Sequence, residues 1–226
     1  MNGYFSIAID GPGGAGKSSL SKRLALELNI IYVDTGAIYR TLGLYCLNHG
    51  IDCKDEDSIK KNLPFVKIEI KHEAGIQKMF LNETDVSNMI RTPEVSIAAS
   101  DVSSLASVRN FLLDMQRKFA KEHSVVLDGR DIGTVVLPDA DCKIFLTASA
   151  AVRAERRLKE LKEKGIDQSF EDVLKDIEYR DYQDSHRKTA PLKQADDAVL
   201  IDTTNLSFEE SYNKLLEVVN EKINLC

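Results

Sequence analysis

The sequence predicts an α/β fold in which helices cover both faces of a parallel sheet. Five short apolar segments alternate with longer helical patterns, and this order favours parallel strands that are buried on both faces. The five segments are 5–9, 30–33, 124–127, 142–147 and 198–202. A chain of 226 residues is long enough for one large domain, or for one domain with a small insertion. We predict a single core domain over 1–226.

The first apolar segment leads into a glycine-rich loop. Phe5–Ile9 and Asp10 are followed by Gly11–Ser19, and a helix is expected from Ser19 to Leu28. Strand, glycine-rich loop and helix in this order allow backbone N–H groups and a helix N-terminus to surround a phosphate. Lys17 has the length to reach the outer phosphates, and the Ser18 hydroxyl is a suitable Mg²⁺ ligand. We expect a nucleotide-binding loop; a glycine-rich turn that happens to carry a lysine is the alternative.

The next segments predict a second buried strand followed by helices. The apolar residues of 30–33 end at Asp34, and a helix should follow to about Asn48, with Thr35 available as its N-cap. A short polar helix over 55–62 should stop before Pro64.

The pattern changes to strict alternation between 63 and 90. Apolar and charged residues alternate over 66–71, a second strand is expected over 78–82, and a third short strand over 84–86. Alternation is typical of antiparallel strands with one exposed face, unlike the buried strands elsewhere. We therefore expect 63–90 to be an insertion that forms a small antiparallel sheet.

The remainder of the chain returns to alternating helices and strands. Helical patterns cover 91–99, 105–121, 149–163, 169–185 and 207–223. The strand at 124–127 ends in Asp128. Because ligands bind at the carboxyl ends of parallel strands, we expect Asp10, Asp34 and Asp128 to share one rim with Gly11–Ser19.

The composition argues against several classes of function. The net charge is −6, which does not favour sequence-independent nucleic-acid binding, since such binding depends on neutralising phosphates. No apolar run has membrane-spanning length and the N-terminus lacks signal-peptide features, so we expect a cytoplasmic protein without membrane association. The cysteines have no zinc or CxxC spacing, which predicts free thiols at Cys46, Cys53, Cys142 and Cys226. We expect a monomer.

Scattered arginines are the candidate anion-binding groups of this acidic chain. Guanidinium groups suit phosphate because they are bidentate and permanently charged. The candidates are Arg40, Arg109, Arg130, Arg180 and Arg187. A further set, Arg153, Arg156 and Arg157, forms one helix face. This face is either a lid that closes over phosphates or a solvated helix surface.

Four motifs in this chain resemble those of bacterial cytidylate kinases. They are GPGGAGKS at 11–18, DTGAIYR at 34–40, DGRDIGTV at 128–135, and Tyr-Arg-Asp at 179–181 with Arg187 and Ala-Pro-Leu at 190–192. The resemblance covers essentially the whole chain, and 63–90 is similar to that family's extended nucleotide-monophosphate domain. It implies the P-loop nucleoside-monophosphate-kinase fold with a central parallel five-stranded sheet. Thr35 stands where the pattern has serine, so a hydroxyl is kept.

The resemblance implies that ATP, Mg²⁺ and CMP or dCMP bind here, and it implies a role for each motif residue. ATP phosphates would be held by Gly11, Pro12, Gly13, Gly14, Ala15, Gly16, Lys17, Ser18 and Ser19, and Mg²⁺ by Ser18. The CMP phosphate would be held by Arg40, Arg130 and Arg187, the cytosine by Ser100, Arg109 and Asp131, and the sugar end by Arg180 and Asp184, with Thr35 also contacting substrate. The catalytic set would be Lys17, Arg130, Arg187 and the lid arginines Arg153, Arg156 and Arg157, with the lid over 153–168.

The chemistry of cytosine agrees with these base-reading residues. Cytosine presents an amino donor where uracil presents a carbonyl acceptor, so a carboxylate such as Asp131 favours cytosine and repels uracil. Two alternatives remain open. One is a kinase of another small acceptor, either a different nucleotide or a hydroxyl metabolite such as shikimate. The other is a nucleotide-dependent switch or nucleic-acid motor, which the acidic composition disfavours.

Overall fold

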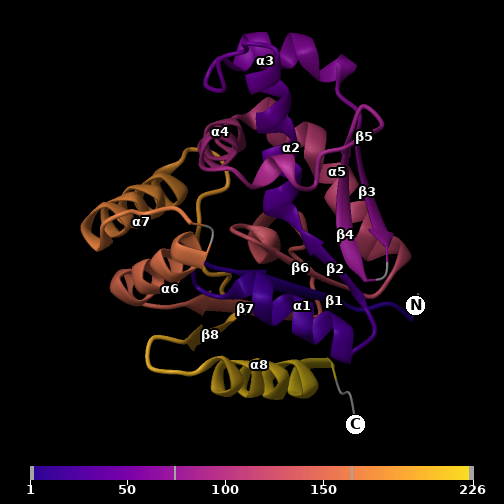
Figure 1. Cartoon of the computed structure of the whole chain (residues 1–226). Coiled ribbons are helices and arrows are strands. Elements are labelled where there is room, and N and C mark those ends of the chain that lie inside the picture. Colours follow the sequence, from indigo (N-terminus) through magenta and orange to yellow (C-terminus); the bar gives the residue numbers. More distant parts are fainter. Residues whose placement is uncertain (1–2, 74, 164, 224–226) are drawn as a thin grey trace.

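A five-stranded parallel sheet forms the centre of the computed structural model, which describes residues 3–73, 75–163 and 165–223 (Figure 1). The strand order is β2-β6-β1-β7-β8, and every neighbouring pair is parallel. The strands are β1 (Ser6–Asp10), β2 (Ile31–Asp34), β6 (Val125–Gly129), β7 (Cys142–Thr147) and β8 (Val199–Asp202). This arrangement confirms the predicted α/β fold and its five strands.

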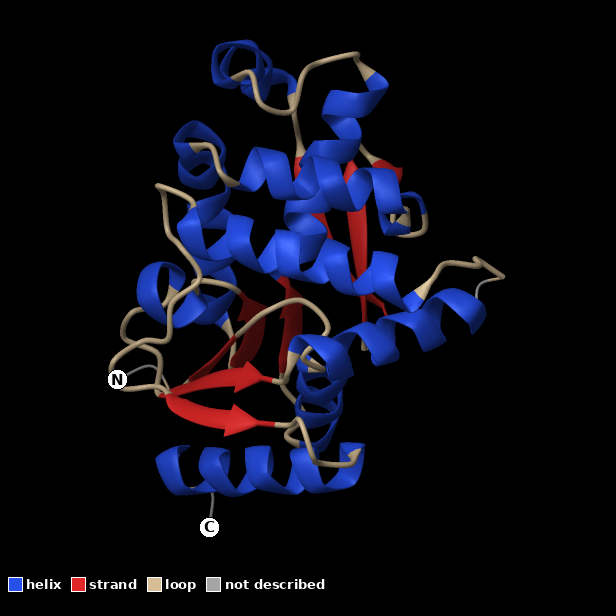
Figure 2. Cartoon of the chain, turned by 90° about the vertical axis from the view of Figure 1, so that its left-hand side faces the viewer, coloured by secondary structure: helices blue, strands red, loops and turns tan. Residues whose placement is uncertain are grey.

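Alternate residues of the central strands face opposite helical layers. Ile7 and Ile9 pack in one core with α1 (Lys17–Glu27) and α8 (Phe208–Ile223), whereas Ala8 belongs to the core on the other face. Since side chains of a strand alternate between faces, a continuous apolar strand requires cover on both sides. Figures 1 and 2 show this cover, with α8 beneath the sheet and most other helices above it.

The upper layer is built on a close contact between two helices. These are α2 (Thr35–Asn48) and α4 (Pro93–Ser103), and α5 (Ala106–Glu122) packs beside α4. A Cβ at Gly43 would lie 3.0 Å from the backbone nitrogen of Ala99, so glycine permits this close approach. The helix predicted over 91–99 in fact begins at Pro93, with Thr92 as its N-cap, and continues to Ser103.

The predicted antiparallel sheet is confirmed. Its strands are β3 (Ile68–Glu73), β4 (Ile76–Leu81) and β5 (Thr84–Asp85), and they follow α3 (Glu56–Asn62) and η1 (Leu63–Phe65). Buried residues of this sheet, including Ile68 and Met79, belong to the same core as α2 and the upper face of the main sheet. The short turn η2 (Met89–Arg91) leads from this sheet to α4.

Two charged helices lie together at one end of the main sheet (Figures 1 and 2). They are α6 (Ala150–Glu163) and α7 (Phe170–His186), and they share a small core of Ala154, Leu161 and Val173. The predicted lid, 153–168, therefore includes most of α6.

Several local predictions need correction. Helix α1 begins at Lys17 rather than Ser19. The N-cap of α2 is Asp34, not Thr35, because the Asp34 carboxylate accepts the backbone N–H of Ala37 (2.9 Å). The motif after Asp128 contains an unpredicted turn of π-helix, η3 (Ile132–Val136).

The structure also bears on the predicted free thiols and on the search for membrane-spanning helices. Cys46, Cys53 and Cys142 are free and buried, and Cys226 lies outside the described residues. Within the described ranges, none of the helices has the length and apolar character needed to cross a bilayer.

Candidate active site

The glycine-rich loop lies at the carboxyl end of β1 and adopts a conformation that depends on its glycines. Gly11, Gly14 and Gly16 all have positive φ angles, of 146°, 77° and 94°. A Cβ at Gly11 would overlap the carbonyl oxygen of Leu146, so the loop passes directly over the end of β7. Gly16 precedes α1 and offers no side-chain cap, which leaves the first N–H groups of the helix available to a phosphate.

Lys17 is buried within this loop. Its Nζ donates hydrogen bonds to the carbonyl oxygens of Gly11 and Pro12, each at 2.7 Å. Burial, followed by the charge of Arg130, lowers the pKa of Lys17 well below its ordinary value. A phosphate anion beside this ammonium would favour the charged form, so the site gains electrostatically from binding an anion.

Ser18 lies against the acidic end of β6. Its hydroxyl donates to Asp128 Oδ2 (2.6 Å), and the Tyr32 hydroxyl donates to Oδ1 (3.2 Å). Burial and the charge of Asp34 raise the pKa of Asp128 to about 6. Thr35 is buried and donates to the backbone carbonyl of Asp128 (2.7 Å), so its hydroxyl supports the end of β6.

These residues fit a metal that is held largely by phosphate and water. Among the described residues no cluster of three or more histidine, cysteine or acidic side chains could bind an ion alone. A hydroxyl and a buried carboxylate beside a phosphate loop supply two oxygen ligands of the kind that Mg²⁺ prefers, leaving its other positions to phosphates and water. Ser18 and Asp128 therefore suit Mg²⁺ accompanied by a nucleotide.

Arg130, which lies beside Lys17, forms a half-buried cationic group with Arg180. Arg130 Nε donates to Asp184 Oδ2 (2.7 Å). Arg180 lies close enough to Arg130 and Arg40 for their charges to lower its pKa. Burial, then Arg130, lower the pKa of Arg180 to about 10. Burial alone would raise the pKa of Asp184, but the surrounding arginines lower it below its ordinary value.

Two arginine side chains, one of this group and one beside it, retain a buried N–H without a hydrogen-bond partner. These are Nε of Arg40 and Nε of Arg180, counted over the residues that the structure describes. Arg40 also donates to Asp34 Oδ2 (2.7 Å), so only part of its hydrogen-bonding capacity is used. Buried donors are normally satisfied, and unpaired guanidinium N–H groups on a cationic rim suit an anionic ligand.

A second ionic cluster surrounds Asp131. Arg109 donates to Asp131 Oδ2 and Arg187 to Oδ1 (3.3 Å), and all three side chains are at most 8 % exposed. Arg109 also donates to the carbonyl of Ser103 (3.0 Å), and Arg187 to the Ser103 hydroxyl (3.3 Å). Arg187 Nε donates to the carbonyl of Ala190 (2.7 Å). Through its bond to Asp131, Arg187 contacts one of the predicted base-reading residues.

Asp10 fixes the backbone that follows Asp131. Its carboxylate accepts the N–H groups of Ile132 and Gly133, both at 2.7 Å, at the start of η3. Burial raises the pKa of Asp10 to about 6 against the effect of these two hydrogen bonds. The strand-end carboxylates therefore differ in role: Asp10 holds η3, Asp34 caps α2, and Asp128 binds Ser18.

The three arginines of α6 occupy different environments. Arg153 is 4 % exposed, donates to Ala148 and Gly13 carbonyls (2.8 and 3.1 Å), and forms a bidentate pair with Asp181 (3.0 and 2.5 Å). Arg156 donates to the carbonyl and hydroxyl of Thr203 (3.0 and 3.2 Å). Arg157 pairs with Glu160 at the surface (3.1 Å).

The structure thus brings most of the predicted site residues to one rim of the sheet. It also places there residues that were not predicted. Ser100 is half-buried, and its carbonyl accepts the Ser103 hydroxyl (2.8 Å). Sequence reasoning did not single out Ser103, Tyr32 or Asp181. Only Asp181 had a signal, since it adjoins Arg180 in the Tyr-Arg-Asp motif.

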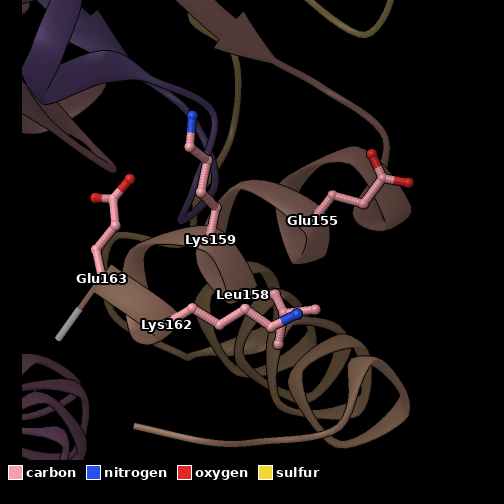
Figure 3. Close-up of a pocket in the computed structure, with 5 residues that line it drawn as sticks. All are labelled: Glu155, Leu158, Lys159, Lys162 and Glu163. Carbon is pink, nitrogen blue, oxygen red and sulfur yellow. The ribbon is translucent and has the colours of Figure 1, made fainter. Parts of the chain in front are cut away.

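A pocket on α6 is lined by none of the ionic groups described above (Figure 3). Its lining residues come from this one helix and are Glu155, Leu158, Lys159, Lys162 and Glu163. The lining contains neither the phosphate loop nor the paired arginines and aspartates. We therefore place the candidate site at the rim of the sheet.

Comparison with known proteins gives a consistent result. Residues 7–221 match the model of the family described as Cytidylate kinase. The chain is 48 % identical over 222 residues to "Cytidylate kinase" of Lactobacillus johnsonii, covering 98 % of this chain and 96 % of that protein. It is 52 % identical over 219 residues to "Cytidylate kinase" of Thermosipho melanesiensis, covering 97 % and 98 %.

A solved structure with lower identity shares the fold. It is an uncharacterized protein from Eubacterium ventriosum, with a TM-score of 0.52 and 14 % identity over 96 % of this chain and 98 % of that one. At this identity the likeness concerns the fold alone.

Proposed function

Because the chain belongs to the cytidylate kinase family, we propose that it catalyses transfer of the γ-phosphoryl group of ATP to CMP or dCMP at the carboxyl edge of its five-stranded sheet. The products are ADP and CDP or dCDP. The observation that carries the proposal is the juxtaposition of two ionic groups. Lys17 and its glycine loop lie beside Arg130, and Asp184 links this cationic group to the cluster around Asp131.

The acceptor phosphate is proposed to bind among arginines whose N–H groups are only partly paired with protein acceptors. Arg40 and Arg180 offer their free Nε groups, Arg130 is adjacent, and Arg187 completes the set if it leaves Ala190. Phosphoryl transfer needs two anions held in line and their repulsion cancelled rather than covalent help. The acceptor phosphate is already ionised, so we assign no general base.

The donor phosphates are proposed to lie in the loop Gly11–Ser19, with Lys17 leaving its two loop carbonyls to pair with them. Mg²⁺ held at Ser18 and Asp128 would neutralise charge on the donor phosphates. Arg156 reaches the Ala15 carbonyl of this loop from α6 (3.5 Å), and Arg153 supports the loop through Gly13. Arg157 would have to turn from Glu160 to join them. Closure of the lid 153–168 and the insertion 63–90 would exclude water and suppress ATP hydrolysis.

The base is proposed to be read by Asp131, Arg109 and Ser100, with Arg180 and Asp184 at the sugar end. Thr35 stays a predicted substrate contact. Asp131 is held by Arg109 and Arg187 in a fixed orientation, which suits a carboxylate that must accept a cytosine amino group. Mispairing such buried groups with uracil is costly, and this cost is the source of discrimination. We further predict that the protein is a monomer, that it is located in the cytoplasm and that it has no nucleic-acid partners.

A substrate panel tests the proposal. Purified protein is assayed with ATP and CMP, dCMP, UMP or AMP, with Asp131→Asn as the variant and Asp139→Asn, a loop residue outside the cluster, as the matched control. We expect CMP and dCMP to be preferred, and Asp131→Asn to raise the UMP-to-CMP ratio of kcat/KM about tenfold or more, because an amide can donate to uracil. Preference of the wild type for UMP or AMP would overturn the base assignment.

A further inference from the structure

The outer edge of β2 is covered by two side chains of the inserted sheet. Strand β2 is an edge strand, since it pairs only with β6 in the described sheet. Its outward polar groups meet the hairpin of β3 and β4 instead. Gln77 Oε1 accepts the N–H of Asp34 (2.8 Å), Gln77 Nε2 donates to the Asp34 carbonyl (3.3 Å), and His72 Nε2 lies 2.9 Å from the Tyr32 carbonyl.

Gln77 and His72 are cross-strand partners on this hairpin. They are directly opposite each other in the register of β3 and β4. Tyr32 and Asp34, two residues apart in β2, present their backbone groups to the same edge. The insertion is thus tied to the main sheet at two adjacent points, and only the Gln77 point involves the strand end at the candidate site.

Asp34 is the residue through which this contact reaches the acceptor site. Its Oδ1 caps α2 at Ala37 (2.9 Å), and its Oδ2 accepts from Arg40 (2.7 Å). Because Gln77 holds both the N–H and the C=O of Asp34, it fixes the peptide groups on either side of that residue. The direction of the Asp34 carboxylate, and with it the position of the Arg40 guanidinium, follows from this restraint.

We propose that Gln77 is a positioning residue which couples the inserted sheet to the phosphate-binding arginine Arg40 through Asp34. Gln77 touches no reacting atom and acts through Asp34. The insertion then contributes to acceptor binding by pre-organising Arg40, in addition to covering the site. This inference rests on the proposed function, because it identifies Arg40 as a ligand of the CMP phosphate.

Two near-isosteric variants of the same hairpin provide a matched pair. Gln77→Met keeps the side-chain length and removes both hydrogen bonds to Asp34, together with the weak bond from Nε2 to the Met79 sulfur. His72→Phe keeps the edge-on ring contact with Phe119 and removes the bond to Tyr32. Since one hydrogen bond contributes about 0.5–1.5 kcal/mol, we expect Gln77→Met to raise the KM for CMP about three- to tenfold.

The expected pattern separates positioning from simple stabilisation. The KM for ATP should stay within about twofold in both variants, and His72→Phe should leave the KM for CMP unchanged while lowering the melting temperature comparably. In an Arg40→Lys background, Gln77→Met should have little further effect on the KM for CMP, because both changes interrupt one pathway. Gln77→Glu retains the acceptor for the Asp34 N–H but sets a carboxylate oxygen against the Asp34 carbonyl, so it should also raise the KM for CMP. It serves if Gln77→Met does not fold.

The proposal is overturned if both hairpin variants raise the KM for CMP equally, if Gln77→Met affects ATP as strongly as CMP, or if its effect persists fully with Arg40→Lys. A wild-type protein without CMP kinase activity would instead refute the proposed function. The two failures are therefore distinguishable.

Discussion

The ion pair between Arg153 and Asp181 allows a quantitative test of how α6 and α7 hold the phosphate loop. The Arg153 side chain is 5 % exposed and that of Asp181 is 29 % exposed. Removing one partner of a buried pair costs about 3–5 kcal/mol, and the partial exposure of Asp181 reduces this figure. We expect Asp181→Asn to lower the free energy of unfolding by about 2 kcal/mol, since its amide retains one acceptor.

Arg153→Met should cost more than Asp181→Asn. It also removes the hydrogen bonds to Ala148 and Gly13, so we expect about 3 kcal/mol. The double variant should cost less than the sum of the two single variants, with a coupling energy of about 1–2 kcal/mol. In activity assays both single variants should raise the KM for ATP. Arg153→Met removes the hydrogen bond to Gly13, and Asp181→Asn weakens the contact that orients Arg153 toward Gly13.

Urea unfolding of the two single variants and the double variant measures this coupling, and steady-state kinetics with ATP gives the functional readout. Lys143→Met, which removes a partly exposed ion pair with Asp197, is the control for loss of an ionic contact away from the phosphate loop. Additive unfolding free energies, within about 0.5 kcal/mol, would refute the coupling. If Asp181→Asn leaves the KM for ATP unchanged while Arg153→Met abolishes turnover, Arg153 acts directly on the donor phosphates instead.

Three further predictions concern the phosphate loop. Burial lowers the pKa of Lys17 to about 7, so the unfolded state binds more protons than the folded state between about pH 7 and 10, and the free energy of unfolding should rise with pH in this range. ATP binding near pH 8 should take up a proton. Calorimetry in buffers of different ionisation enthalpy measures this uptake, which should be absent in Lys17→Met. Gly11→Ala should prevent ATP binding and lower the free energy of unfolding by about 3 kcal/mol or more, because its Cβ would overlap the Leu146 carbonyl. Gly50→Ala is the control, since the added Cβ meets nothing there, and it should leave ATP binding intact. Equal ATP affinity in both variants would contradict this account. Ser18→Ala should weaken MgATP binding about tenfold or more and metal-free ATP binding little, and an equal loss for both forms would exclude Ser18 as a metal ligand.

Local patterns were sufficient for most of the architecture. The five apolar strands, the glycine loop before α1 and the alternating strands of the insertion are each encoded within about ten residues, where side-chain periodicity reflects burial directly. Errors occurred where the signal is short or ambiguous. Asp34 and Thr35 are both good capping residues, and the choice depended on Asp128, whose carbonyl takes the Thr35 hydroxyl.

The sequence by itself determined that the chain is an α/β protein with a phosphate loop and with scattered arginines that suit an anionic ligand. Tertiary structure decided which carboxylate meets which arginine: Asp184 pairs with Arg130, Asp131 with Arg109 and Arg187, and Asp181 with Arg153. The physical reason is that a charged side chain carries no periodic signal of its partner. Partners such as Ser18 and Asp128, which are 110 positions apart, meet only because parallel strands end at one edge of the sheet.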